Sequence, residues 1–324
     1  MPFCTKLSEI LLNLDEEKKK SFMSTAVEYG YDHFVDLRAS EVGLTRKQAT
    51  FALVPVTFYG KKTTQIKQGT IVSTLDNRLY YLTENIILDE NGEGEGICKA
   101  QNSGSQYNVK AKEICYLPVK YADVISVENK ESYNDAYDEE SNEDLYNRYL
   151  LKVRTPATSG NKHHYEQWAS EVTGVGYAKC IPAEELGQGG KVKVIIANSN
   201  KRGASEELIQ KTYDYINEVR PLLSGILEIV TVKEVNIDIT GKVEIDTSIT
   251  LSEVQEIFRN LIEDYLDNNA YKTNKISIAK IQSMLIDIEG VIDCANIKIN
   301  GIAGNISLST DVIAVLQNIE LGVI

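Results

Sequence analysis

The chain of 324 residues is long enough for about two domains, and 43% hydrophobic residues can supply real cores. Its formal net charge of −13 at pH 7 repels a phosphate backbone, and no basic stripe offsets that charge, so we expect no nucleic-acid binding. No apolar run approaches the ~20 residues of a membrane-spanning helix, and the first residues lack a signal-peptide pattern. We therefore expect synthesis in the cytoplasm and no membrane insertion.

Residues 1–50 are predicted to form an N-terminal helical arm, with a helix beginning in the segment 5–36. Its apolar positions are spaced i, i+3, i+4 and i+7, which places them on one face of an otherwise charged helix. A helix this short has little stability alone, so that face must be buried. Two interpretations stay open: the helix docks on its own domain, or it makes a coiled or bundled contact with another subunit. The apolar positions are Leu7, Ile10, Leu11 and Leu14.

From residue 51 to 127 the pattern changes to short β segments, separated by Gly, Asn and Asp turn signals. We predict a small β domain over 51–127. The following stretch, 128–142, is dense in Asp, Glu and Asn and poor in aliphatic residues. That composition is typical of an exposed connection, so we expect an acidic link at a domain boundary.

Residues 143–189 are predicted to form a central helical segment in two pieces, with the break near residues 155–160. Pro156 and Gly160 would stop the first piece, because proline and glycine do not continue a helix. Ser159 or Asn161 is available to cap the second piece.

Residues 190–324 show the most regular patterns. Alternating apolar residues predict a half-buried strand over 234–246. The next helix starts with a capping-box pattern at Thr250 and Glu253, and a further helix and strand follow. We expect an α+β multidomain protein: N-terminal helices, a small β domain, a central helical segment and C-terminal α+β (ferredoxin-like) sandwich units, one or two in tandem.

None of the patterns that could carry chemistry is complete. The acidic loop from Asp89 resembles a calcium loop, but Ala100 stands where a closing Glu is needed, which favours a β-turn tip. The glycine-rich stretch before Lys191 precedes a strand, not a helix, so a phosphate cradle is not indicated. Adjacent His163 and His164 diverge on a helix and cannot share one site. We therefore predict no catalytic residues.

The five cysteines are far apart and form no C-x-x-C pair, so neither a metal site nor a redox couple is indicated. Reduced thiols, mostly buried, are the expected state. Together with the incomplete motifs, this predicts a protein that is not an enzyme and that needs no cofactor or metal.

From Asn142 onward the order of motifs resembles the core of the baseplate J-like proteins, wedge subunits of contractile phage tails and of phage-tail-like bacteriocins. An acidic helix start with an Arg leads to a Pro-x-x-x-Gly break, a Tyr-x-x-Trp-Ala helix, a Gly-Val turn and a Gly-rich approach to a Val-rich strand. An Ile-x-x-Gly-Thr turn in the β domain and an Arg-Pro dipeptide extend the resemblance. The residues that carry it are Gly69, Arg148, Pro156, Gly160, Tyr165, Trp168, Gly174, Gly189, Arg220 and Pro221.

These motif residues have plain physical roles. Trp168 is expected to anchor helix packing, and an interface hot spot is the functional alternative. Pro156 and Gly160 set the helix break, and Gly69 and Gly104 allow turns. They build shape and catalyse nothing.

The resemblance implies a structural wedge component that links the hub to the sheath and transmits the trigger for contraction. It implies partners among other wedge proteins, a second J-like copy or paralogue, and hub and sheath-initiating proteins, in a six-fold ring. It also implies synthesis in a bacterial cytoplasm and assembly into a virion tail or a bacteriocin baseplate. The acidic link over 128–142 would be a hinge between discrete arrangements.

Two other classes of protein remain alternatives. A small-ligand-binding module or enzyme could use the same α+β domains, since fold does not fix function. A cell-surface adhesin is the third interpretation, and it would require export.

Overall fold

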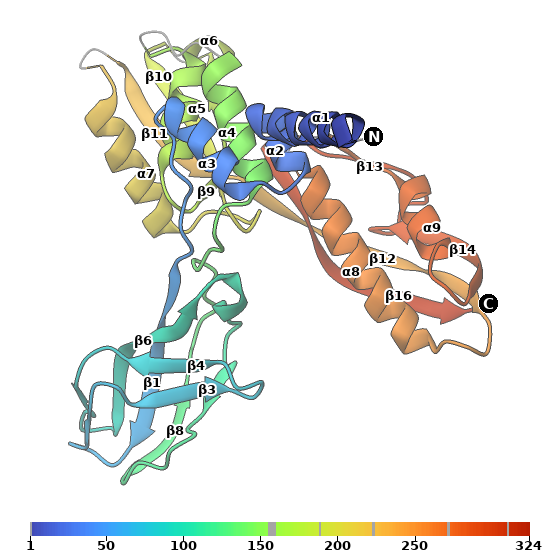
Figure 1. Ribbon diagram of the computed structural model, residues 1–324. Coiled ribbons are helices and arrows are strands. Elements are labelled where there is room, and N and C mark those ends of the chain that lie inside the picture. The colour runs from blue at the N-terminus through green and yellow to red at the C-terminus, as the bar shows by residue number, and fades with distance from the viewer. Residues whose placement is uncertain (1, 155–159, 188, 222–223, 271–272, 310) are drawn as a thin grey trace. The chain divides into compact units, whose positions relative to one another are not determined.

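The computed structural model describes residues 2–154, 160–187, 189–221, 224–270, 273–309 and 311–324 (Figure 1). The chain divides into two compact units, Met1–Gly174 and Val175–Ile324. Within the described ranges, no helix combines the length and the hydropathy that crossing a membrane requires.

The first unit contains a helical part built from both of its ends. Helices α1 (Pro2–Ser21), α2 (Met23–Glu28) and α3 (Asp32–Glu41) come from the N-terminus, and α4 (Asn142–Arg154) and α5 (Lys162–Glu171) follow the β domain. Leu145 of α4 is fully buried against apolar residues of α2 and α3. A core therefore joins segments about a hundred residues apart in sequence. Its buried members are Met23, Ala26, Val35, Ala39, Leu44 and Leu145.

The β domain lies between these helical segments and forms a six-stranded antiparallel sheet in the order β7-β3-β4-β6-β1-β8. Along β1 the side chains alternate between exposed and buried, so one face supplies the core, with Val54, Val56 and Phe58 fully buried. A two-stranded pair, β2 with β5, adds to the domain. The strands are β1 (Phe51–Gly60), β2 (Gln65–Ile66), β3 (Ile71–Thr74), β4 (Leu79–Leu82), β5 (Ile86–Ile87), β6 (Glu93–Ser103), β7 (Ile114–Tyr116) and β8 (Val124–Glu128), with a short 3₁₀ turn at Ser105–Tyr107.

The second unit begins with a three-stranded sheet in the order β11-β10-β9. Strand β10 runs parallel to β11 and antiparallel to β9. Helix α7 connects the two parallel strands, and Ser205 caps it by accepting a hydrogen bond from the Leu208 amide at 3.3 Å. The elements are β9 (Val175–Ile181), α6 (Ala183–Leu186), β10 (Lys191–Asn198), α7 (Glu206–Val219) and β11 (Ile226–Thr231).

The second sheet of this unit has the order β14-β12-β16, with β12 parallel to β16 and antiparallel to β14. Helices α8 and α9 cover it, and Phe258 and Ile262 of α8 are fully buried in the shared core (Figure 1). Helix α8 starts with the predicted capping box of Thr250 and Glu253. The elements are β12 (Lys233–Ile245), α8 (Leu251–Asn269), β13 (Lys275–Ile276), α9 (Ile278–Ile286), β14 (Val291–Ile299), β15 (Ile306–Ser307) and β16 (Val312–Val323).

The predicted α+β class is confirmed, with helices at the N-terminus and several sheets after them. The sequence indicated no strand over 175–181 or over 312–323, yet β9 and β16 are there. Among the described residues, the second unit has two three-stranded sheets and a two-stranded pair, β13 with β15, so the ferredoxin-like description is not confirmed. The finer domain boundaries stay a prediction.

The C-terminal core gives a test of the packing. Phe258 is fully buried between α8 and the sheet, so Phe258→Ala should cost about 3–5 kcal/mol of local stability through lost burial and the cavity left behind. Hydrogen exchange of the amides in α8, followed by mass spectrometry, should show correspondingly faster opening. Ile286→Ala, at an exposed position on α9, is the matched control and should change exchange little. Equal effects of the two changes would contradict this packing.

Candidate functional site

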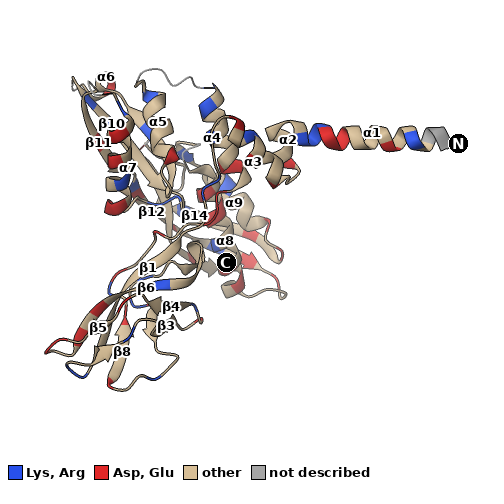
Figure 2. Ribbon diagram, turned by 60° about the vertical axis from the view of Figure 1, so that its left-hand side comes forward, with Lys and Arg blue, Asp and Glu red and all other residues tan. Residues whose placement is uncertain are grey.

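The apolar stripe predicted on the first helix lies on α1, and it is exposed. Leu7, Ile10, Leu11 and Leu14 retain between 47% and 58% of their accessible surface. Figure 2 shows that this stretch of α1 carries almost no charge, whereas acidic and then basic residues collect at its end near α2. An exposed apolar stripe of this length is typical of a helix that packs against a partner.

The C-terminal end of α1 is held by polar and aromatic contacts. Glu16 accepts a hydrogen bond from the Tyr31 hydroxyl, and Lys19 pairs with Glu16 at 2.8 Å. The Lys19 ammonium also lies over the Tyr29 ring, 4.7 Å from its centroid. These contacts lower the pKa of the Glu16 carboxyl, through the bonds from Lys19 and Tyr31. They fix only the last turns of α1 and leave the apolar stripe open.

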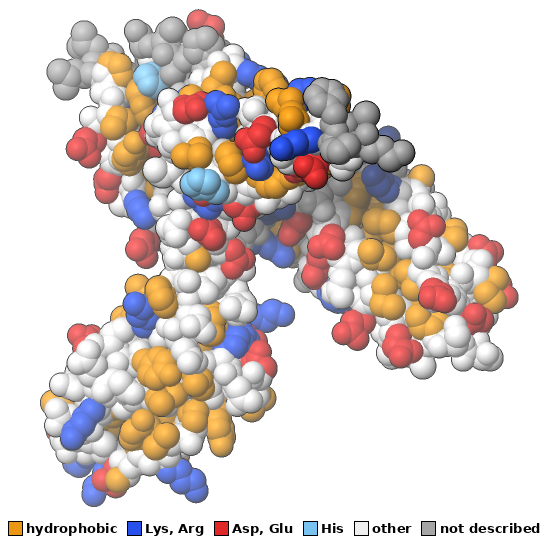
Figure 3. Space-filling model, in the orientation of Figure 1, with side chains coloured by type: hydrophobic (Ala, Val, Ile, Leu, Met, Phe, Trp, Pro, Cys, Tyr) orange, Lys and Arg blue, Asp and Glu red, His pale blue; other side chains and the backbone are white. Residues whose placement is uncertain are grey.

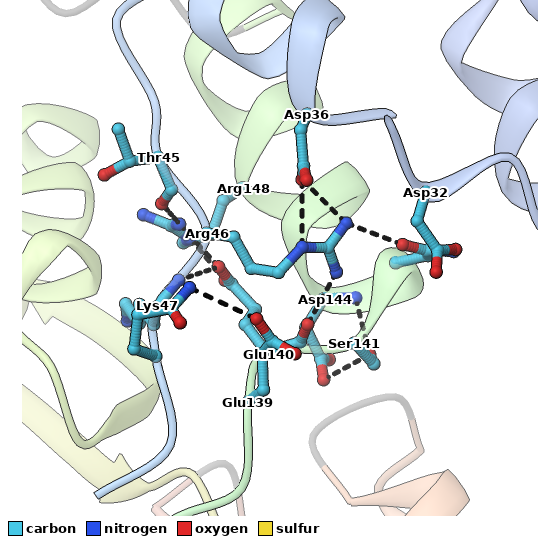
Figure 4. Close-up of polar contacts among 12 residues, drawn as sticks. Asp32, Asp36, Thr45, Arg46, Lys47, Glu139, Glu140, Ser141, Asp144 and Arg148 are labelled. Carbon is cyan, nitrogen blue, oxygen red and sulfur yellow. Dashed lines mark hydrogen bonds and ion pairs between the residues drawn. The ribbon is translucent and has the colours of Figure 1, made fainter. Parts of the chain in front are cut away.

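A second feature, which we call the polar junction, consists of Asp36, Arg46, Glu140, Asn142 and Arg148 (Figure 4). It lies where the chain approaches and leaves the β domain. The Arg46 guanidinium donates to Asp36 Oδ1 from Nε at 2.9 Å, to the Glu140 carbonyl at 2.7 Å and to Asn142 Oδ1 at 2.7 Å. One side chain thus binds α3 and the segment that precedes α4.

Glu140 is the most buried charge of the polar junction. Its carboxylate accepts two hydrogen bonds from Arg148, from Nε at 2.6 Å and from Nη2 at 2.7 Å, and one from the Lys47 amide at 3.0 Å. Arg148 also donates to the Thr45 carbonyl at 2.7 Å. The Glu140 and Arg148 side chains are only 6% and 12% exposed, so this fork-shaped pair is shielded from water and salt.

Lys47 lies beside this pair and has an altered acidity. Burial, together with the positive charge of Arg148, lowers the pKa of the Lys47 ammonium from 10.5 to about 8. Glu140, Asp144 and Glu171 act in the opposite direction. The charged form of Lys47 therefore opposes folding at neutral pH.

The acidic stretch expected as a link is bound along its length. The Asn129 side chain, fully buried, accepts from the Ile114 amide at 2.8 Å and donates to the Lys110 and Glu131 carbonyls. Further along the chain, the Asp138 carboxylate accepts a hydrogen bond from the Ser105 amide, and the Tyr137 carbonyl accepts one from the Thr50 amide. The acidic side chains of this stretch serve as acceptors for backbone and side-chain donors, a use that composition does not reveal.

The predicted motif residues are spread over both units. Gly69, Gly160 and Gly174 all have positive φ, of 84°, 79° and 102°, which glycine adopts without the penalty that other residues incur. Gly189 is exposed in open space. Arg220, the C-cap of α7, donates hydrogen bonds to the Asn217 side chain and to the Gly225 carbonyl, and Pro221 is the next residue. Arg148 belongs to the polar junction, and Pro156 lies outside the described residues.

Tyr165 and Trp168 lie together on α5. Their rings meet edge to face, with centroids 5.2 Å apart, and Trp168 is 8% exposed. The His164 ring stacks on Trp168 at 3.8 Å, and burial lowers the pKa of His164. Asn161 caps this helix through the His164 amide, as one of the two predicted caps. Burial of this kind is what a packing anchor requires, and the role of Trp168 stays a prediction.

The acidic loop that resembles a calcium loop forms a turn between β5 and β6. The Asp89 carboxylate accepts hydrogen bonds from the Asn91 and Glu93 amides, both at 2.8 Å, and these bonds lower its pKa. No group of three or more His, Cys, Asp or Glu side chains among the described residues is placed to hold a metal ion.

The sequence analysis missed most of the polar junction. It singled out Arg148 but not Glu140 or Asn142, which lie more than ninety positions from their partners Lys47 and Arg46 along the chain. Their only local signal was that charged residues flank both ends of the β domain. Pairing across such a distance has no periodicity that a single sequence can show.

The fold defines a multidomain α+β protein in which a β domain is inserted among helices and is followed by two sheets connected by helices. Three family models match the chain in the same order: the baseplate J-like protein barrel domain over 55–135, the baseplate J-like central domain over 157–231, and the baseplate J-like protein C-terminal domain over 236–322. The chain belongs to the baseplate J-like protein family. It is a baseplate component of a phage or prophage tail-like particle.

Two relatives come from a phage-like element and from a phage. The chain is 27% identical over 330 residues to the phage-like element PBSX protein XkdT of Bacillus subtilis, an alignment that covers 99% of this chain and 88% of that protein. It is 28% identical over 186 residues to the baseplate protein gp47 of Escherichia phage Mu, covering 57% and 52% of the two chains. A chain of the anti-feeding prophage baseplate aligns over 98% of this chain and 86% of its own length, at 11% identity and a TM-score of 0.40.

The polar junction can be tested by removing one charge. Arg148→Met keeps much of the side-chain stem but leaves the Glu140 carboxylate without its main partner, so the first unit should lose about 3 kcal/mol of stability. Trp168 is the single tryptophan and lies in this unit, so its fluorescence during urea unfolding reports the change. Arg38→Met, which breaks an exposed pair with Glu41, should cost less than about 1 kcal/mol. A loss for Arg148→Met as small as the control's would contradict the role of the polar junction.

The lowered pKa of Lys47 predicts that the unfolding free energy depends on pH in the alkaline range. Because its pKa is lowered on folding, the unfolded chain holds a proton that the folded chain releases between about pH 8 and pH 10.5. The unfolding free energy should rise with pH across this window, by about 3 kcal/mol. Lys47→Met should lack that part of the rise, as measured by urea unfolding at pH 7.5, 8.5 and 9.5. Parallel curves for the two proteins would contradict the lowered pKa.

Proposed function

We propose that this protein is a wedge component of the baseplate of a contractile tail or contractile injection particle, where it links the hub to the sheath and transmits the trigger for contraction. Membership of the baseplate J-like family supports a structural role, and we propose that the protein is not an enzyme. Its relatives include a baseplate protein of phage Mu and a protein of a phage-like element, and they support its assembly into a virion tail or a bacteriocin particle.

The exposed apolar stripe of α1 carries the proposal. Four aliphatic side chains on one face of a 20-residue helix remain about half exposed within a chain whose domains have their own cores. Burying such a stripe against helices of neighbouring subunits would stabilise an assembly, because each buried aliphatic side chain contributes roughly 1.5–3 kcal/mol. We propose that α1 bundles with a second J-like copy or paralogue, or with another wedge protein, in a six-fold ring.

The polar junction supports the second part of the proposal, the transmission of a trigger. The β domain is connected to the helices by only two stretches of chain, residues 42–50 and 129–141, and the polar junction binds both at their helical end. The two stretches are also hydrogen-bonded to each other between Thr50 and Tyr137, so together they can pass a rotation of the β domain to α3 and α4. We propose that bending occurs within 128–142 on the β-domain side of the polar junction.

We propose the boundaries 1–50, 51–127, 128–142, 143–189 and 190–324 for the arm, the β domain, the link, the helical segment and the C-terminal region. We propose that Trp168 anchors the packing of α5, and that the motif glycines permit the turns on which the family's shape depends.

The proposal can be tested on α1 in particles produced by the native host. The double change Leu11→Asp and Leu14→Asp places two charges in the apolar stripe, and it should reduce the incorporation of the protein into tail particles at least tenfold while its domains stay folded. Asn13→Asp adds a charge at an exposed position beside the stripe and should assemble like the parent chain. Electron microscopy of particles and mass spectrometry of their proteins give the measurement. Normal incorporation of the doubly changed protein would overturn the role of α1, and a parent protein that is absent from all tail particles would overturn the proposed function.

A further inference from the structure

A groove on the C-terminal domain combines an apolar floor with an acidic rim. It has a volume of about 650 Å³ and lies between the first turns of α8, the loop before α8 and the loop after α9. Its lining includes Ile249, Ile257, Leu261 and Ile288 among the apolar residues and Glu253, Glu256, Asp287 and Glu289 among the acidic ones. Figure 3 shows hydrophobic side chains gathered on this domain with Asp and Glu side chains among them.

The floor of the groove is fixed by the domain core. Ile288 is buried in that core, and Ile249 and Leu261 pack against it. Gly290 has φ +90°, and a Cβ there would lie 2.6 Å from Ile249, so the loop after α9 lies directly against the loop before α8. Ile257, by contrast, is 42% exposed and points its apolar surface outward. The groove is therefore formed in the folded domain without any partner.

The rim carries four carboxylates, and none of the described residues that line the groove is a Lys or Arg. Glu253 is held in the capping box, and the bonds from Thr250 lower its pKa, so it is ionised at neutral pH. Within the described part of the chain, Glu256 and Glu289 have no ion-pair partner. The one arginine of α8, Arg259, contacts Glu263 instead. A concentration of unpaired negative charge around an apolar floor is complementary to a basic segment with an apolar anchor.

We propose that this groove binds a basic segment of a different baseplate protein, with an aliphatic or aromatic side chain on Ile257 and Leu261 and Lys or Arg side chains on Glu256 and Glu289. The inference rests on the proposed function, since the partner is a neighbour in the particle. A second copy of this chain is a poor occupant, because its net charge is −13 and the basic run of α1 already pairs with Glu16 and Glu17.

The first experiment uses the parent protein in purified tail particles. A carbodiimide couples carboxylates to lysine amines that are in direct contact, and mass spectrometry identifies the linked residues. We expect Glu256 or Glu289 linked to a lysine of another baseplate protein, within one helical turn of an aliphatic or aromatic residue. Two results would overturn the inference and leave the proposed function standing. One is that the links join only two copies of this chain, and the other is that neither residue is linked in particles that contain the protein. Absence of the protein from the particles would overturn both.

The second experiment reverses the charge of the rim. Glu256→Lys with Glu289→Lys should lower the amount of the linked partner that copurifies at least tenfold, because two attractions become repulsions. The control, Glu218→Lys with Glu320→Lys, makes the same charge change at two exposed positions away from the groove and should retain the partner. Changing the linked lysine of the partner to Glu should restore binding to the first variant. Equal retention by the two variants would count against the groove as the binding site.

Discussion

The buried carboxylate of Glu140 is the contact on which the first unit depends. It accepts hydrogen bonds from Arg148 on α4 and from the backbone of Lys47, so it joins the chain that leaves the β domain to the chain that approaches it. Arg46 extends the same network to α3. A charge buried away from water is stable only when it is fully paired, because the desolvation of a lone carboxylate costs several kcal/mol. The two stretches that connect the β domain to the helices therefore meet at this carboxylate.

The domains of this protein each supply their own core, and this leaves particular apolar surfaces without a use inside the chain. The β domain, the N-terminal helices and the C-terminal sheets bury separate clusters. The stripe on α1 stays outside those clusters, and Ile257 in the groove beside α8 is exposed. In a protein whose family builds baseplates, such surfaces are the natural contacts for neighbouring subunits. One is nearly uncharged and the other is rimmed by acid, so they suit different partners.

Several local features were readable from the sequence because they depend on near neighbours. The capping box of Thr250 and Glu253, the cap at Asn161 and the alternating pattern of β12 all involve residues a few positions apart. The order of many such weak signals also carried the family resemblance, which the three matching domains confirm. Strands β9 and β16 were not predicted from the sequence. Their burial does not alternate strictly, since one or both faces are partly covered, so the period of two is weak.

The sequence by itself determined the α+β class, the apolar stripe of the first helix and the family, since each follows from spacing within one segment or from the order of segments. Only the tertiary structure decided that the stripe stays exposed, that Glu140 meets Arg148 and Lys47, and that carboxylates from α8 and from the loop after α9 surround one apolar groove. Those facts depend on which segments meet across long stretches of chain. Such meetings are set by the packing of whole faces, and no local pattern records them.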